Sequence, residues 1–185
     1  MRKLLCYSHA NFNRQMTVKG WLCSNDLDKA NAAVISISTK NDQDPKHWFD
    51  DDGPSILNIE FDDVSPDMWW KDGDDDEAER LFREGDFESS SGYFDHRYKS
   101  KYGNVSDLHA MDYSDAKKMR EFIELNKDRD FYLHCSAGVS RSQAVVRYIL
   151  DTYHDREWET NKDNPCVCPN MHVYRMLRRV EYLGL

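Results

Sequence analysis

The sequence predicts an α/β protein with a central, mostly parallel sheet of about four to five strands flanked by helices. Short apolar segments rich in β-branched residues alternate with segments of helical period along the 185 residues. In addition, Phe131–Leu133 reads as a buried strand that is followed by small residues and an apolar helix from Gln143. This length suits one domain, so we expect residues 1–185 to form a single domain with an acidic insertion at about 64–111.

The first elements of the chain are short. Leu4–Tyr7 and Met16–Leu22 are both apolar enough to be strands, and a brief helix is expected over Asp26–Ala32. Ala33–Ile37 contains several β-branched residues and predicts a strand, and Ile56–Phe61 predicts the next one.

The segment 64–111 is the least regular part of the chain. An acidic run leads into Glu77–Glu84, where one or two helical turns are expected, and Ser89–Gly92 is expected to be a loop. Aromatic and basic residues follow between Tyr93 and Tyr102. Two interpretations stay open: a surface insertion anchored by its aromatic side chains, or a lid that contacts substrate, because long loops in compact domains are often functional.

The last third of the chain predicts two further helices. Ser114 is a plausible N-cap for a helix that ends near Asn126, with apolar residues on one face. After the strand and the apolar helix, residues 164–169 are expected to form a loop. Asn170 or a neighbour then begins the final helix.

Composition and charge exclude several classes of function. The formal net charge is −9, which argues against a general binder of nucleic acid or of anionic membranes. The five cysteines show no disulfide-like spacing, and Leu4–Tyr7 is too short for the core of a signal peptide. No stretch is long and apolar enough to span a bilayer. We therefore expect a soluble cytoplasmic protein whose thiols stay reduced.

The loop after Phe131–Leu133 has the chemistry of an anion site. It leads into a helix N-terminus, where free backbone N–H groups and the helix dipole favour negative charge and stabilise a thiolate at Cys135. The guanidinium of Arg141 can hold two oxygens of a phosphoryl group. Gly138 lets the backbone turn without a Cβ, and the hydroxyl of Ser142 can donate to the sulfur.

These residues carry a resemblance to a known family. The pattern His134-Cys135-x-x-Gly138-x-x-Arg141-Ser142 resembles the signature loop of cysteine-dependent protein tyrosine and dual-specificity phosphatases, in particular compact members encoded by phages and bacteria. The similarity extends over Ala33–Phe61 and Tyr113–Leu183 and fails across the acidic insertion.

The resemblance implies a reaction without metal or cofactor. Cys135 would form a phosphocysteine intermediate, Arg141 would hold phosphoryl oxygens, Ser142 would help the sulfur leave, and His134 would orient the loop from behind. The phosphate cradle would consist of the backbone amides of Ser136, Ala137, Gly138, Val139, Ser140 and Arg141.

The same resemblance requires an aspartic acid as general acid. Asp63 is the first candidate because Asp62 and Asp63 follow a predicted strand, so they can share an edge of a parallel sheet with the Cys loop. Asp62 is the second candidate. Asp107, with Asp112 nearby, is the third, because it lies at the separation from the Cys that is common in the dual-specificity branch.

Two further features admit more than one interpretation. Cys166 and Cys168, with His154 and His172 nearby, could suggest zinc, but the spacing matches no strong zinc pattern and ordinary thiols are the preferred interpretation. Asn170 could pack beneath the site or brace the Cys loop or the Asp loop.

Taken together, the sequence predicts a phosphatase acting on phosphotyrosine, phosphoserine or phosphothreonine, with a phosphorylated protein or a small phosphomonoester as substrate. No general nucleic-acid binding and no membrane partner are expected, and the oligomeric state is open. One alternative is a module that binds phosphorylated partners without turnover. A sulfurtransferase or arsenate reductase with a similar Cys loop is another.

Overall fold

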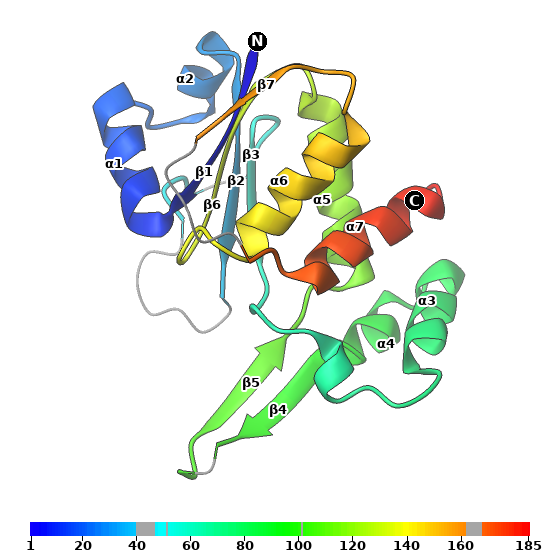
Figure 1. The fold of residues 1–185 in the computed structure, drawn as a ribbon. Coiled ribbons are helices and arrows are strands. Elements are labelled where there is room, and N and C mark those ends of the chain that lie inside the picture. The colour runs from blue at the N-terminus through cyan, green and yellow to red at the C-terminus, as the bar shows by residue number, and fades with distance from the viewer. Residues whose placement is uncertain (40–46, 51, 101, 162–167) are drawn as a thin grey trace.

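The computed structural model describes residues 1–39, 47–50, 52–100, 102–161 and 168–185. Its centre is a five-stranded parallel sheet in the order β3-β2-β6-β1-β7 (Figure 1). The strands are β1 (Arg2–Ser8), β2 (Ala32–Ser38), β3 (Ile56–Glu60), β6 (Asp130–Cys135) and β7 (Trp158–Thr160). The predicted α/β fold is therefore confirmed, and the strand that ends at Cys135 lies in the middle of the sheet.

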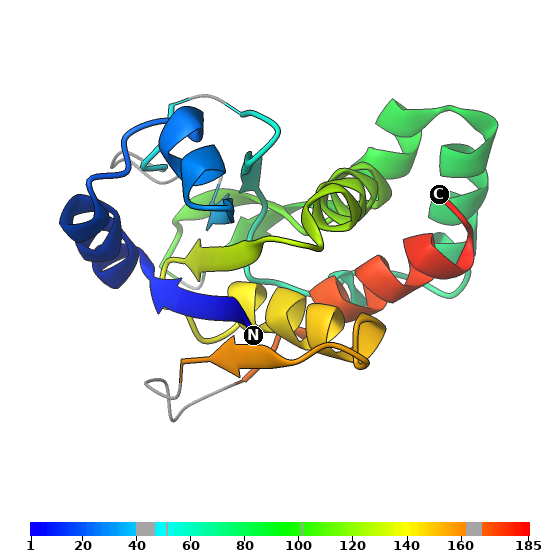
Figure 2. The ribbon, with the colours of Figure 1, turned by 90° about the horizontal axis from the view of Figure 1, so that it is seen from above.

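Helices cover both faces of this sheet (Figures 1 and 2). On one face lie α1 (His9–Lys19) and α2 (Ser24–Lys29), and on the other lie α5 (Tyr113–Asn126), α6 (Arg141–Thr152) and α7 (Met171–Tyr182). Each face has its own apolar cluster, because successive side chains of a strand point to opposite sides. None of the described helices is long and apolar enough to cross a membrane.

Two expectations for the N-terminal part are wrong. The strand expected over Met16–Leu22 does not form, because Met16 belongs to α1. Phe12 and Met16 are one helical turn apart and both are fully buried, so the helical period decides the structure here. The helix expected over Asp26–Ala32 is α2, which begins earlier, at Ser24, and ends at Lys29.

The segment 64–111 is more regular than the sequence suggested. It contains a short 3-10 turn (Pro66–Met68), α3 (Asp74–Glu84), α4 (Phe87–Gly92) and the antiparallel pair β4 (Asp95–Lys99) and β5 (Val105–His109). The loop expected at Ser89–Gly92 is wrong, because Asp86 caps α4 by accepting from the backbone N–H of Ser89.

This segment packs on the body through aromatic side chains. Phe82 and Phe94 are buried, and both rings contact the ring of Tyr113 in α5. The β4–β5 pair, in contrast, projects from the body as a two-stranded ribbon (Figure 1). Aromatic side chains therefore anchor α3 and the residue before β4 on the body, which was one of the two interpretations that the sequence left open.

The C-terminal elements follow the predictions with shifted ends. The N-cap of α5 is Asp112 and not Ser114, because the Asp112 carboxylate accepts from the backbone N–H of Asp115 and the Asp115 carboxylate accepts from that of Asp112. Helix α6 begins at Arg141, immediately after the Cys loop. Asn170 caps α7 as predicted. The short edge strand β7 was not predicted from its polar sequence.

Candidate active site

The Cys loop connects the end of β6 to the start of α6 and is held against β1. Gly138 has a φ of +72°, and a Cβ at this position would lie 2.5 Å from the backbone nitrogen of Ser8. Both the left-handed conformation and the close approach therefore require glycine. The backbone N–H of His9 donates to the carbonyl of Ser136 over 3.2 Å, which ties the loop to the first turn of α1.

The thiol of Cys135 lies at the base of the loop and is only 2% exposed. Its Sγ accepts from the backbone N–H of Gly138 at 3.3 Å and lies 3.1 Å from the Oγ of Ser142. The thiol of Cys6, on the neighbouring strand β1, donates to the same Ser142 Oγ over 3.0 Å. Because Ser142 accepts from Cys6, its own hydrogen can point at the sulfur of Cys135.

Cys6 is a site residue that the sequence analysis did not find. Burial raises the pKa of its thiol to about 12, so Cys6 stays protonated and acts as a donor at neutral pH. No local motif marks it. The only available signal was its place in an apolar strand next to the strand that carries Cys135.

Arg141 is 3% exposed, and its guanidinium is clamped between three strand ends. Nη1 donates to the carbonyls of Ser38, at the end of β2, and Phe61, just after β3, over 3.1 and 2.7 Å. Nη2 donates to the Oγ of Ser136 in the Cys loop over 3.0 Å. Nε is buried and has no hydrogen-bond partner among the described residues. A buried donor without a partner is costly, which marks this edge of the guanidinium as a position for a ligand oxygen.

Among the general-acid candidates, Asp63 is the one that contacts the Cys loop. Its Oδ1 accepts from the Oγ of Ser140 at 2.7 Å and from the Nδ2 of Asn170 at 2.8 Å, and the residue is exposed. Asn170 thus caps α7 and braces Asp63 at the same time, which confirms the suggested bracing of the Asp loop.

The other candidate carboxylates are used elsewhere. Asp62 is buried, and its Oδ2 accepts from the backbone N–H of His109 at 2.7 Å. Asp107 lies on the ribbon, 3.9 Å from Arg97, and Asp112 caps α5. Among the hydrogen bonds between described residues, Asp63 is the one of these four that bonds to the Cys loop.

His134 points to the opposite face of the sheet from Cys135. Its ring packs on His9, with centroids 5.2 Å apart, and on Phe12, with centroids 4.2 Å apart. Burial, together with repulsion from nearby cationic groups, lowers its pKa to about 3, so the ring is neutral. Both ring nitrogens are buried and have no partner among the described residues. His134 therefore lies behind the Cys loop, where its ring packs against α1.

The suggested zinc ligands do not come together where the structure describes them. Cys166 lies outside the described residues. The ring of His172 is buried and bonded to the carbonyl of Met111 at 2.8 Å, whereas Cys168 and His154 are exposed. Within the described ranges, the only group of metal-ligating side chains is a different one, formed by His109, Asp112 and Asp115.

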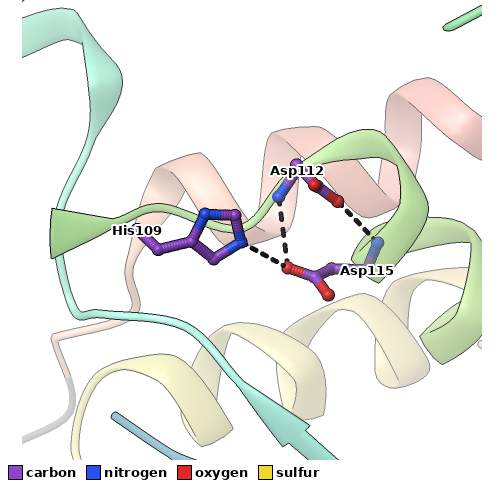
Figure 3. Close-up of side chains that lie close together, drawn as sticks. All are labelled: His109, Asp112 and Asp115. Atoms are coloured by element: carbon purple, nitrogen blue, oxygen red, sulfur yellow. Dashed lines mark hydrogen bonds and ion pairs between the residues drawn. The ribbon is translucent and has the colours of Figure 1, made fainter. Parts of the chain in front are cut away.

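Figure 3 shows that this second group is bonded internally. Asp112 and Asp115 form the capping box of α5, and the ring of His109 lies 3.3 Å from Asp115 and 2.8 Å from Asp95. Burial opposes a charge on His109, but the hydrogen bonds and attraction of Asp115 and Asp95 outweigh it and raise the pKa to about 9. A protonated His109 thus supplies the positive charge that these carboxylates need. Its backbone N–H and carbonyl also form hydrogen bonds with Asp62.

Comparison of this chain with protein-family models, with curated proteins and with solved structures finds no match. The resemblance to cysteine-dependent phosphatases therefore rests on residues of the sequence, chiefly those of the Cys loop.

Proposed function

We propose that this protein is a cysteine-dependent phosphatase that hydrolyses phosphomonoesters. The observation that carries the proposal is the pairing, in one loop, of the buried Cys135 thiol with a buried Arg141 whose Nε has no partner among the described residues. A nucleophile beside unused donors at a helix N-terminus suits a group that brings its own negative oxygens.

In the first step, the sulfur of Cys135 attacks phosphorus. A P–S bond forms, the bond from phosphorus to the ester oxygen breaks, and Asp63 gives its proton to the departing oxygen. Arg141 and the backbone amides of residues 136–141 hold the remaining phosphoryl oxygens, whose charge they stabilise in the transition state.

In the second step, water attacks the phosphorus of the phosphocysteine. Asp63 takes a proton from that water, the P–S bond breaks, and the electron pair returns to sulfur. Ser142 donates a hydrogen bond to the developing thiolate of Cys135. The Cys6 thiol assists because it donates to the Ser142 oxygen, which leaves the Ser142 hydrogen free to point at Cys135.

A second candidate function is recognition of phosphorylated partners without turnover. One observation favours it: Ser140 and Asn170 both donate to Oδ1 of Asp63, so the carboxylate is held against the loop and only Oδ2 is left to serve a departing oxygen. A site with a working cradle and an idle acid would bind phosphate and release it unchanged.

Hydrolysis of 4-nitrophenyl phosphate between pH 5 and 8, with EDTA and a reductant, tests the proposal. We expect turnover in the wild type and in the control Cys23→Ser, whose thiol is exposed. Cys135→Ser should lose roughly 10⁴-fold or more of the rate because serine is a far weaker nucleophile here. Turnover by Cys135→Ser would contradict the mechanism. Absent turnover in the wild type, combined with vanadate binding, would favour the recognition module.

A further inference from the structure

A polar pocket of about 400 Å³ opens beside the Cys loop, on the side of α1. Ala137 of the loop forms one of its walls, and Ser8 and Asn161 form others. Another wall consists of Asn11, Arg14 and Gln15 of α1. The pocket is thus next to the proposed phosphate cradle. Strand β1, which ends at Ser8 in the pocket wall, lies on the opposite side of β6 in the sheet from β3, which precedes Asp63.

The side chains on the α1 wall are hydrogen-bond donors that are not in use. Positions 11, 14 and 15 share one face of the helix, because residues three and four apart are neighbours on its surface. None of these three side chains has a hydrogen bond or ion pair with any residue that the structure describes. The amide of Asn161, by comparison, is fixed by both backbone groups of Cys6, at 3.0 and 2.6 Å.

The guanidinium of Arg14 has no partner among the residues that the structure describes. Most other described arginines are paired with carboxylates, for example Arg129 with Asp28, Arg156 with Asp128 and Arg175 with Asp67. The net charge is −9, yet none of the described residues that line this pocket is acidic. A cation and two amides that have no partner among the described residues, in a pocket whose described lining contains no carboxylate, can be satisfied by an anion.

We propose that this pocket binds a second anionic group, a phosphate or a carboxylate, on the leaving group of the substrate. The inference rests on the proposed phosphatase function, because the first anionic group is the phosphoryl group at Cys135. It specifies the substrate class: phosphomonoesters that carry a second anionic group. Arg14 supplies the charge, and Asn11 and Gln15 add hydrogen bonds to the oxygens.

Two matched pairs of substrates test this preference and identify the source of the second anion. One pair is adenosine 3′,5′-bisphosphate and adenosine 5′-monophosphate. The other is a phosphotyrosine peptide with a glutamate beside the phosphotyrosine, and the same peptide with glutamine there. We expect kcat/KM to be about tenfold higher for the doubly anionic member of at least one pair, since hydrogen bonds to charged groups have that effect.

Arg14→Gln should abolish this preference, whereas Arg83→Gln, which removes an exposed arginine on α3, should keep it. Added salt should weaken the preference in the wild type because exposed charges are screened. A wild type without preference in either pair, or a preference retained in Arg14→Gln, would overturn the inference.

Titration calorimetry on Cys135→Ser separates this inference from the proposed function. If the wild type hydrolyses 4-nitrophenyl phosphate but ignores the second anion, the pocket assignment is wrong and the phosphatase proposal stands. In another outcome, the wild type hydrolyses nothing, while Cys135→Ser binds adenosine 3′,5′-bisphosphate about tenfold more tightly than the double variant Cys135→Ser, Arg14→Gln. In that case the pocket assignment stands and the phosphatase proposal is wrong. Equal binding by both proteins would overturn the pocket assignment independently of turnover.

Discussion

Two clusters of reactive side chains in this protein differ in how their polar groups are used. The His109, Asp112 and Asp115 group could look like a metal site by composition, but each of its members is bonded to another or to the start of α5 (Figure 3). At the Cys loop, the Nε of Arg141 is buried without a partner among the described residues.

This difference separates a structural cluster from a candidate functional one. Polar groups that hydrogen-bond to one another need no ligand, and here their hydrogen bonds stabilise the contact between α5 and the ribbon. Unused donors that converge beside a nucleophile need a partner from outside the chain. Residue type alone does not distinguish the two clusters, and the state of their hydrogen bonds does.

The largest effect that can sharpen this comparison is expected at Asp63. Asp63→Asn keeps the shape but removes the transferable proton, so hydrolysis of phenyl phosphate should fall by roughly 10²–10⁴-fold. Hydrolysis of 4-nitrophenyl phosphate should fall much less, because its leaving group needs little help. Steady-state rates for both substrates check this, with Asp107→Asn as a control on the ribbon. An equal loss for both substrates would place the acid elsewhere.

The next effect is expected at Arg141. Arg141→Lys keeps one charge but loses the planar fork, so kcat/KM for aryl phosphates should fall by about 10²–10³-fold and inhibition by phosphate should weaken. Arg147→Lys, an exposed position in the same helix, is the matched control. Because Arg141 also holds the carbonyls of Ser38 and Phe61, urea unfolding should accompany the kinetics. A variant that is stable and fully active would remove Arg141 from the site.

His134 should control part of the acid sensitivity of the fold. Its folded pKa of about 3 lies below the usual value, so the unfolded chain takes up the proton first and stability is lost as the pH falls from about 6.5 towards 3. This contribution amounts to about 2 kcal/mol between pH 7 and pH 5.

Urea unfolding of His134→Phe at both pH values should show a correspondingly smaller loss of stability than the wild type. The exposed His154 provides the control, since His154→Gln should keep the wild-type dependence. Identical pH dependence in wild type and His134→Phe would show that the ring is protonated in the folded state.

The smallest effect is expected in the internally bonded cluster. The pKa of His109 is raised to about 9, so its stabilisation is complete below about pH 6.5 and is lost as the pH rises through 9. His109→Gln should therefore cost roughly 1–2 kcal/mol at pH 6 and much less at pH 10, measured by urea unfolding.

Zinc or manganese provides a direct check of the distinction between the two clusters. Neither ion should raise the thermal unfolding temperature of the wild type through this cluster, because the cation that its carboxylates need is already supplied by His109. A stabilisation by metal that disappears in His109→Gln would show that the cluster is a metal site.

The sequence alone was sufficient to predict those features that are determined by residues close together in the chain. The Cys loop was predicted because its nucleophile, its glycine and its arginine lie within one short segment between a strand and a helix. The buried strands β2, β3 and β6 were recognisable from apolar and β-branched runs. The error at Met16 arose because a short apolar run fits either period, and the packing of Phe12 and Met16 decided for the helix.

Tertiary structure decided which distant residues join the site. Asp63 meets Ser140 across 77 positions and Asn170 across 107, and Cys6 meets Ser142 across 136. These contacts depend on strand order, since β1 and β2 both flank β6 and bring different loops to one edge. That Arg14 has no partner among the described residues, and that His109 is paired, also depends on neighbours that are remote in sequence. Periodicity and capping are local and can be read from the chain, whereas the partner of a side chain is set by the packing of the whole fold.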